Sequence, residues 1–389
     1  MEKNKKIFLI FTSVFLGCVL LAGIVLGTVS IIRNVRSVMS YKGVYLYEGE
    51  ANYLSASYKY DFMSALGDNG IACYDSESFW QSDAGDGKTY GEILSQSTEK
   101  YLQSVLVGNY LFDRNTSLTK NDKEAINKTI EEVLEYQADG DVDRFNEIGA
   151  PMGFDYRDFK KAAKLIYKYE MAESVIFGFE GAALASGNFT AECDEYFENN
   201  YSKVRLMIIR TDGEFATDPE TGKQVLDEYD EAEKAAALAK ISDIRSKIES
   251  GMMNEGAFIW HIKNEYPTGT VNDDTGYYFS STSAYSLNFA KEGAAEVVKL
   301  ALSTKVGEYS ECVLDIGVCF IYKCELDAQA YARYTLSHFF EDFYKNAAHY
   351  IYAKSVDAYI PDVKVKDKYN SSAVISQPRN NKLLIKEFG

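Results

Sequence analysis

The sequence predicts a mixed α+β protein with an N-terminal transmembrane helix, a mostly helical domain and a smaller α+β domain. Three observations predict this fold class. Residues 7–32 contain no charged side chain. Apolar residues recur at helical spacing between about residue 40 and residue 202, and from residue 203 short β-branched runs alternate with helical patterns. The length of 389 residues is enough for two or three domains.

The composition narrows the class of protein. There are 58 acidic and 41 basic residues, which gives a net charge of -17. A nucleic-acid-binding protein needs a basic surface for phosphates, so the charge argues against that function. The chain also has 30 tyrosines. A tyrosine ring has an apolar body and a polar tip, so these residues suit either contacts with client polypeptides or ordinary packing.

The charge-free run at residues 7–32 predicts a single membrane anchor, because a helix of that length exceeds the roughly 30 Å of a bilayer core. Three lysines precede the run, which favours a cytoplasmic tip at residues 1–6 and an extracytoplasmic remainder. The predicted location is therefore the cell membrane, with one span. Cys18 follows Leu16 and Gly17, so lipoprotein processing at Cys18 is the alternative to an uncleaved anchor.

Residues 33–202 are predicted to form one helical domain. Thr119 is a suitable N-cap for a helix that places Ile126, Ile130 and Val133 on one side. Several amphipathic helices in succession can bury their apolar sides only against each other, so they belong to one domain.

From residue 203 the pattern predicts strand, helix, helix, strand, helix, strand, strand. The run KVRLMIIR is the first strand, an acidic loop follows at 211–224, and a long helix ends at Gly251, which suits a left-handed cap. Two shorter helices are expected near 254–265 and 292–303, before a hairpin at 307–324. An amphipathic helix is then expected at 327–355, followed by a polar tail that carries DVKVKDKY.

This order of elements resembles the parvulin family of peptidyl-prolyl isomerases. The fragments that carry the resemblance are VRLMII, KAAALAKISDIRSKIESG, AFIWHIKNEY, TGYYFS, KLALSTKVGEYSECV and GVCFIYK. With a helical domain and an anchor before it, the whole chain is similar to the SurA/PrsA group of extracytoplasmic foldases. The resemblance implies a chaperone domain at 33–202, a parvulin-like domain at 203–326, and a C-terminal helix within 327–389 that completes the helical domain. It implies no cofactor.

Two family histidines are replaced. Leu206 stands where the first strand usually has histidine, and Cys319 stands where the last strand has it. Isomerisation crosses an amide barrier of about 20 kcal/mol, and a catalyst lowers it by binding the twisted bond in an apolar pocket with a few polar groups. A neutral imidazole supplies one donor and one acceptor, which leucine lacks, so weak catalysis or none is expected. The resemblance makes the following residues candidates for a peptide groove: Leu206, Met207, Tyr278, Phe279, Val297, Cys319 and Ile321.

The expected function is therefore a membrane-anchored chaperone or foldase that binds unfolded or secreted polypeptides. Two alternatives stay open. In the first alternative, the chain is an active isomerase that uses other polar groups, for which Asp273 and Asp274 are the candidates. In the second, it is a structural subunit of a membrane complex.

Three cysteines, Cys312, Cys319 and Cys324, lie in the hairpin segment, and their spacing fits no metal site. Cys319 and Cys324 are five residues apart, so on a strand they face opposite sides. A Cys312–Cys319 bridge needs a two-residue turn at Asp315 and Ile316, where Asn-Gly or Asp-Gly is preferred, so a different register is expected. No histidine is placed to activate Cys319, and all three are expected to be packing residues.

Overall fold

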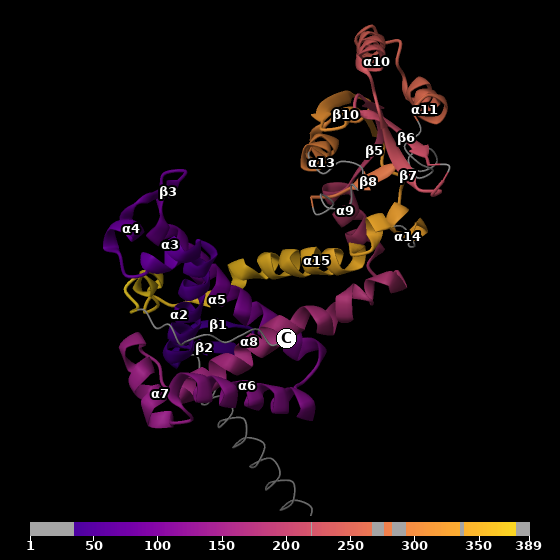
Figure 1. The fold of residues 1–389 in the computed structure, drawn as a ribbon. Helices are drawn as coiled ribbons and strands as arrows, with labels where there is room; N and C mark the ends of the chain where they lie inside the picture. The colour runs from indigo at the N-terminus through magenta and orange to yellow at the C-terminus, as the bar shows by residue number, and fades with distance from the viewer. Residues whose placement is uncertain (1–34, 219, 267–275, 282–292, 335–337, 379–389) are drawn as a thin grey trace, which may run out of the picture. The chain divides into compact units, whose positions relative to one another are not determined.

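The protein is described by a computed structural model that covers residues 35–378 apart from 219, 267–275, 282–292 and 335–337. The fold is mixed α+β and mostly helical. The chain forms two units (Figure 1). The helical unit comprises Met1–Phe179 and Tyr352–Gly389, and the sheet unit comprises Glu180–Ile351. The borders of the sheet unit therefore differ from those predicted from the sequence, which lie after residues 202 and 326.

The predicted anchor at 7–32 and the tip at 1–6 lie outside the described residues. Within the described ranges, every helix is too short or too polar to cross a membrane.

The helical unit is built around one long helix, α5 (Tyr90–Asn115), which contacts α8 (Tyr156–Phe177) and α2 (Glu48–Ala65). As predicted, Thr119 caps α6 (Lys120–Ala138), and its Oγ1 accepts a hydrogen bond from the backbone N–H of Asp122. The buried side of α5 includes Leu102, Val105 and Leu106, which recur at helical spacing. Other α-helices that the structure describes in this unit are α3 (Gly67–Ala72), α4 (Glu77–Gln81) and α7 (Val142–Gly149).

A small sheet in the helical unit was not predicted. Its antiparallel strands are β1 (Ser37–Tyr41), β2 (Val44–Tyr47) and β11 (Lys364–Val365), in the order β11-β1-β2. Lys42 and Gly43 connect β1 to β2 with φ of 40° and 92°. Positive φ at both turn residues is typical of the hairpin turns whose twist matches that of the strands. A second hairpin pairs β3 (Asp83–Gly85) with β4 (Lys88–Thr89).

The C-terminal segment that was predicted to be a polar tail is part of the helical unit. It contains η6 (Ile360–Asp362), β11 and η7 (Ser371–Val374), and Val374 is buried in a cluster with Trp80 and Leu94. The Nζ of the buried Lys59 on α2 donates hydrogen bonds to the carbonyls of Ile375 and Gln377, at 2.7 and 2.9 Å. The prediction was wrong because single apolar residues among many charged ones gave no periodic signal.

The sheet unit contains a four-stranded antiparallel sheet in the order β8-β5-β10-β9. Its strands are β5 (Ser202–Arg210), β8 (Tyr277–Phe279), β9 (Tyr309–Leu314) and β10 (Gly317–Cys324). One face packs against α10 (Glu231–Glu249) and α11 (Glu255–Asn264), and the other packs against α13 (Ala294–Ser303) (Figure 1). The predicted order is therefore confirmed for the four strands of this sheet and the three helices that cover it.

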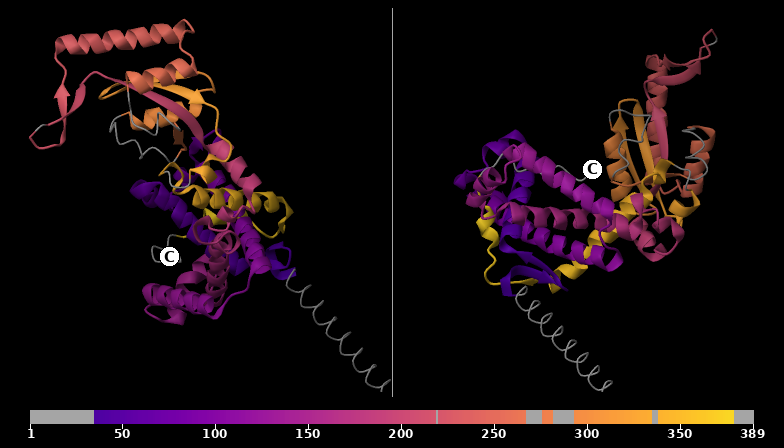
Figure 2. Two further views of the ribbon diagram at one scale, coloured as in Figure 1. Left: turned by 90° about the vertical axis from the view of Figure 1, so that its right-hand side faces the viewer. Right: turned by 90° about the horizontal axis from the view of Figure 1, so that it is seen from below.

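Two elements of the sheet unit differ from the prediction. The acidic segment expected to be a loop contains a hairpin of β6 (Gly213–Thr217) and β7 (Gln224–Glu228), which extends away from the larger sheet (Figure 2). The single helix expected at 327–355 is interrupted. It is replaced by α14 (Ala330–Arg333), η5 (His338–Phe340) and α15 (Phe343–Tyr359).

The interruption has a physical reason in aromatic packing. The rings of Tyr331 and Phe343 stack with centroids 4.1 Å apart, and both contact Phe197 on α9 (Thr190–Asn200). The final turns of α15 belong to the helical unit, where Tyr352 donates a hydrogen bond to the carbonyl of Tyr169 at 3.3 Å. A carboxyl-terminal helix therefore does pack within the helical unit, but only through its last turns.

Candidate functional site on the four-stranded sheet

The two positions that the sequence singled out lie on neighbouring central strands. Leu206 on β5 is paired with Ile321 on β10, and Cys319 on β10 is paired with Ile208 on β5. Alternate residues of a strand share a face, so these four side chains lie on the face that α13 covers. The structure thus brings Leu206 and Cys319 together in one cluster.

On this face the described side chains form a hydrophobic core that α13 covers. Five of the seven groove candidates are fully buried in this core: Leu206, Phe279, Val297, Cys319 and Ile321. Ala301, which lies on α13 with Val297, is fully buried there as well. The other two candidates do not join this cluster. Met207 faces α10 and α11 on the opposite side of the sheet, and Tyr278 contacts aromatic rings near α9. Asp273 and Asp274, the proposed polar substitutes, lie outside the described residues.

Tyr278 belongs to a polar network that joins β8 to the segment after β10. Its hydroxyl donates a hydrogen bond to Asp327 Oδ2 at 2.5 Å, and Lys203 Nζ binds the same oxygen at 2.9 Å. Burial opposes ionisation of Asp327, but these two donors outweigh it, and the pKa of the carboxyl group lies below its ordinary value. Burial and the bond to Asp327 raise the pKa of Tyr278. The network therefore holds a tyrosine hydroxyl beside a carboxylate.

A cavity of about 520 Å³ lies where β5 begins and β10 ends. Its wall includes Ser202, Lys323 and Cys324. Further lining residues come from the end of α9 and the residue after it, from the segment after β8, from α13 and the loop after it, and from the chain after β10: Glu198, Asn199, Asn200, Tyr201, Ser281, Leu302, Val306, Glu325 and Leu326. Burial raises the pKa of Cys324 to about 11, so this thiol is protonated at neutral pH and is a poor nucleophile.

Lys323 is the residue of this region that the sequence analysis missed. It is buried, and its Nζ donates hydrogen bonds to Ser202 Oγ and, at 2.7 Å, to the carbonyl of Ala301. Burial lowers the pKa of its ammonium group. The signal was present in the sequence, because Lys323 lies two and four residues after Ile321 and Cys319 and so shares their buried face.

The hairpin register in this region corrects the sequence analysis. Cys312 and Cys319 are directly opposite each other, and Leu314 pairs with Gly317 across Asp315 and Ile316. Gly317, which follows the turn, accommodates it with a φ of 151°. A side chain has no room at this position, because an added Cβ would lie 2.1 Å from the carbonyl oxygen of Ile209. The cysteines that the structure describes are all free thiols.

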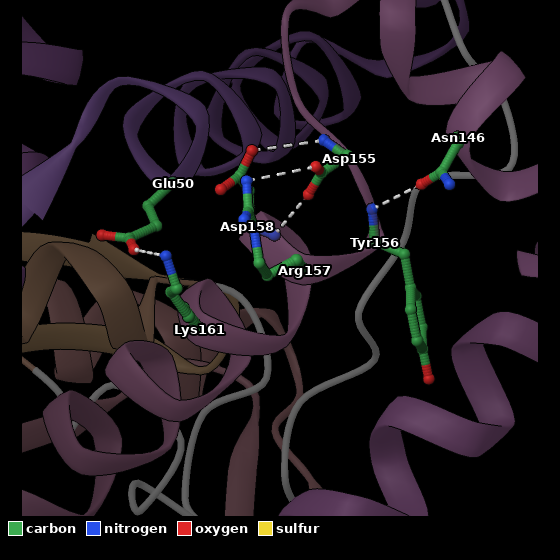
Figure 3. Close-up of polar contacts among 7 residues, drawn as sticks. All are labelled: Glu50, Asn146, Asp155, Tyr156, Arg157, Asp158 and Lys161. Carbon is green, nitrogen blue, oxygen red and sulfur yellow. Dashed lines mark hydrogen bonds and ion pairs between the residues drawn. The ribbon is translucent and has the colours of Figure 1, made fainter.

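A second group of ionisable residues lies in the helical unit, at the start of α8 (Figure 3). Asp155 and Asp158 form a reciprocal capping box, in which Asp155 Oδ1 accepts from the N–H of Asp158 at 2.9 Å. The buried Glu50 of α2 pairs with Lys161 at 3.2 Å, and burial raises its pKa. These contacts cap α8 and join it to α2. The described residues contain no group of three or more potential metal ligands.

The chain is thus a mixed α+β protein with a discontinuous helical unit and a sheet unit whose central face is apolar. No protein-family model and no curated protein matches the sequence. Among solved structures, PrsA from Bacillus subtilis is similar, with 17% sequence identity and a TM-score of 0.20, over 76% of this chain and 96% of that one. The foldase protein PrsA from Lactococcus lactis is similar with 15% identity and a TM-score of 0.18, over 75% and 96% of the two chains.

Proposed function

We propose that this chain is a membrane-anchored, extracytoplasmic chaperone or foldase that binds unfolded or secreted polypeptides. In this proposal residues 7–32 form the anchor, and the helical and sheet units lie outside the cytoplasm. The sheet unit is a degenerate parvulin-like domain with little or no prolyl isomerase activity. The proposal requires no cofactor.

The observation that carries the proposal is the chemistry at positions 206 and 319. Leu206 and Cys319 lie on adjacent strands of one face, where the resemblance to parvulins implies two imidazoles, and both are fully buried in apolar surroundings. His261 lies on α11, over the face of the sheet opposite to Leu206 and Cys319, and its Nδ1 pairs with Glu265 at 2.7 Å. A leucine offers no hydrogen bond to a twisted amide, so the expected role of this domain is binding.

Exposed apolar side chains of the sheet unit support polypeptide binding. Phe215 on β6 is 61% exposed and Trp260 on α11 is 54% exposed. Leu226 pairs with Phe215 across the β6–β7 hairpin and is also exposed. Exposed aromatic and aliphatic groups are the contacts that an unfolded segment, with its own apolar side chains accessible, can use.

Fluorescence anisotropy with the full-length chain and a labelled, permanently unfolded polypeptide tests client binding. We expect saturable binding that weakens at least threefold in a Phe215→Ser, Trp260→Ser double variant. Val313→Ser is the matched control, because Val313 on β9 is also strongly exposed but lies away from these two residues in the sequence. Absence of saturation at high micromolar concentration would remove the chaperone function.

A proline-peptide isomerisation assay tests the catalytic part separately. We expect the wild-type rate to equal the uncatalysed rate within a factor of two. A substantial wild-type rate that Leu206→His leaves unchanged would show that the imidazole position is irrelevant, and the active-isomerase alternative would then replace this part of the proposal.

Membrane extraction tests the anchor. The full-length chain should stay with membranes at high salt and alkaline pH, and Cys18→Ser should not release it. Release by Cys18→Ser would instead support lipid attachment at that cysteine.

A further inference from the structure

Cys312 and Cys319 form a pair across the β9–β10 hairpin. They are directly opposite each other in an antiparallel ladder, with a two-residue turn between the strands. Directly opposed residues in such a ladder have Cα atoms about 4.5–5.5 Å apart and project to the same face. A disulfide requires Cα atoms about 4.4–6.8 Å apart, so the backbone already has the separation that the bond needs.

The two thiols also interact with each other. A hydrogen bond with Cys319 lowers the pKa of Cys312, and the same bond together with burial raises the pKa of Cys319. The Cys319 thiol is also oriented by the backbone, because its S–H donates to the carbonyl oxygen of Phe320 at 3.9 Å. Both side chains belong to the apolar cluster under α13. Neither is part of a group of three or more potential metal ligands among the described residues.

We propose that Cys312 and Cys319 are a dithiol site that forms an intramolecular disulfide when the protein meets a disulfide oxidant, such as glutathione disulfide or a protein disulfide. The thiolate of Cys312 attacks one sulfur of the oxidant and expels the other as a thiol. Cys319 then loses its proton and attacks Cys312 Sγ, which expels the second thiol. Two S–H bonds are replaced by one S–S bond, and the oxidant gains two electrons and two protons.

The two cysteines have different roles in this sequence of steps. Cys312 lies on the edge strand β9 and is 8% exposed, whereas Cys319 lies on the central strand β10 and is fully buried. Cys312 is therefore the residue that an external disulfide reaches first, and its lowered pKa favours the attacking thiolate. Burial raises the pKa of Cys193 and of Cys324 to about 11, which disfavours both as competitors.

The bond would tie the edge strand to the centre of the sheet. The closed loop is short, so the gain in stability is modest, and we expect the Tm of the sheet unit to rise by about 5 °C on oxidation. This inference does not depend on the proposed chaperone function, because it concerns only the hairpin.

Redox titration of the full-length chain tests the inference. The protein is equilibrated in glutathione buffers of graded thiol-to-disulfide ratio, quenched in acid, alkylated and mapped by mass spectrometry. We expect a linked peptide pair about 2 Da lighter than the two thiols, which reports loss of two hydrogens. The equilibrium constant for its formation should be at least tenfold larger in the folded chain than in the same chain in urea.

Single variants separate this site from the other cysteines. Cys324→Ser should leave the link intact, because Cys324 lies outside the opposed pair. Cys319→Ser should trap glutathione on Cys312, whereas Cys312→Ser should leave Cys319 unmodified. The inference is overturned if the folded chain keeps both thiols in every buffer, if folding gives no advantage over urea, or if Cys312 links to another cysteine.

Discussion

Among the described residues, each unit buries one lysine whose ammonium group is held by hydrogen bonds, but the acceptors come from different parts of the chain in the two units. In the sheet unit, Lys323 binds Ser202 and Ala301, which lie 121 and 22 residues away in the sequence. In the helical unit, Lys59 binds the carbonyls of Ile375 and Gln377, which are 316 and 318 residues away. Tyr74 also stacks against the Lys59 ammonium, with its ring centroid 4.0 Å from Nζ.

This difference shows that only the helical unit depends on a segment from the far end of the sequence. The sheet unit is contiguous in sequence, and its main ladders join β5 to β10 and β10 to β9. The helical unit is complete only when the chain end returns, because β11 pairs with β1 and Val374 fills the cluster around Trp80. The C-terminal segment should therefore be essential for the helical unit and dispensable for the sheet unit.

The largest expected effect comes from ending the chain at Tyr359, which removes β11, η7 and both acceptors of Lys59. Removal of the buried side chains of Val363 and Val374 loses about 2 kcal/mol each, and a buried ammonium without its acceptors costs about 2 kcal/mol more. The sum, roughly 6 kcal/mol, is comparable to the stability of a whole domain. Hydrogen exchange measured by mass spectrometry should show loss of protection in α2 and α5 and retention in β5 and β10.

A chain that ends at Pro378 is the matched control, because it keeps every described contact of this segment. If both truncations leave α2 and α5 equally protected, the C-terminal segment is not a structural part of the helical unit. If the shorter chain also exposes β5 and β10, the two units are not independent in stability.

The same difference explains how much the sequence could predict. In the sheet unit, the four strands of the larger sheet and the three helices that cover it each have their own apolar pattern, and their order was predicted correctly. Leu206 and Cys319 could each be placed on a strand because both lie in clear apolar runs, and the resemblance to parvulins implied that the two strands share a sheet. In the helical unit, β11 has only two residues, Lys364 and Val365, and no periodicity can reveal so short a strand.

Two features of the candidate site could not be predicted from local pattern. The turn at Asp315 and Ile316 lacks the residues preferred in a two-residue loop, and it depends on Gly317 and the close approach of Ile209 on a distant strand. The burial of the groove candidates depends on α13, whose position over β5 and β10 is a tertiary contact. The burial of Lys323, by contrast, has a local signal, because Lys323 alternates with Cys319 and Ile321 along one strand.

The second prediction uses the pKa of Lys59, which burial lowers from 10.5 to about 8. Between these values the unfolded chain binds more protons than the folded chain, so the free energy of unfolding rises with pH. Between pH 7 and 9.5 the wild type should gain about 2 kcal/mol relative to Lys59→Met, which has no proton to lose. Urea unfolding can be followed by Trp80 fluorescence in a Trp260→Phe background, since the chain has two tryptophans. Parallel pH profiles for the two proteins would contradict the lowered pKa.

A smaller effect is expected from Tyr278→Phe in the sheet unit. The variant loses the hydrogen bond to Asp327, and a bond to an ionised carboxylate contributes about 1.5 kcal/mol. The pKa of Asp327 is held below its ordinary value of 3.8, so its contribution is present above that pH and is lost as the pH falls through the folded-state pKa. The difference from wild type should therefore shrink in acid. Tyr229→Phe is the control, because the exposed bond from Tyr229 to Glu214 should contribute less than 1 kcal/mol by comparison.

The smallest effect compares two capping boxes, one in each unit. Asp155 caps α8 at a partly buried site, and Asp230 caps the exposed start of α10 by accepting from Ala232 and Glu233 at 2.8 Å. In Asp230→Ala water can replace the lost acceptor, so we expect about 0.5 kcal/mol, whereas Asp155→Ala leaves a less accessible N–H and should cost about 1.5 kcal/mol. Asp155→Asn, which also caps, should recover most of the loss in urea unfolding. Equal losses at the two sites would mean that burial of the helix start does not strengthen the cap, and that the helical unit gains no more from local contacts than the sheet unit does.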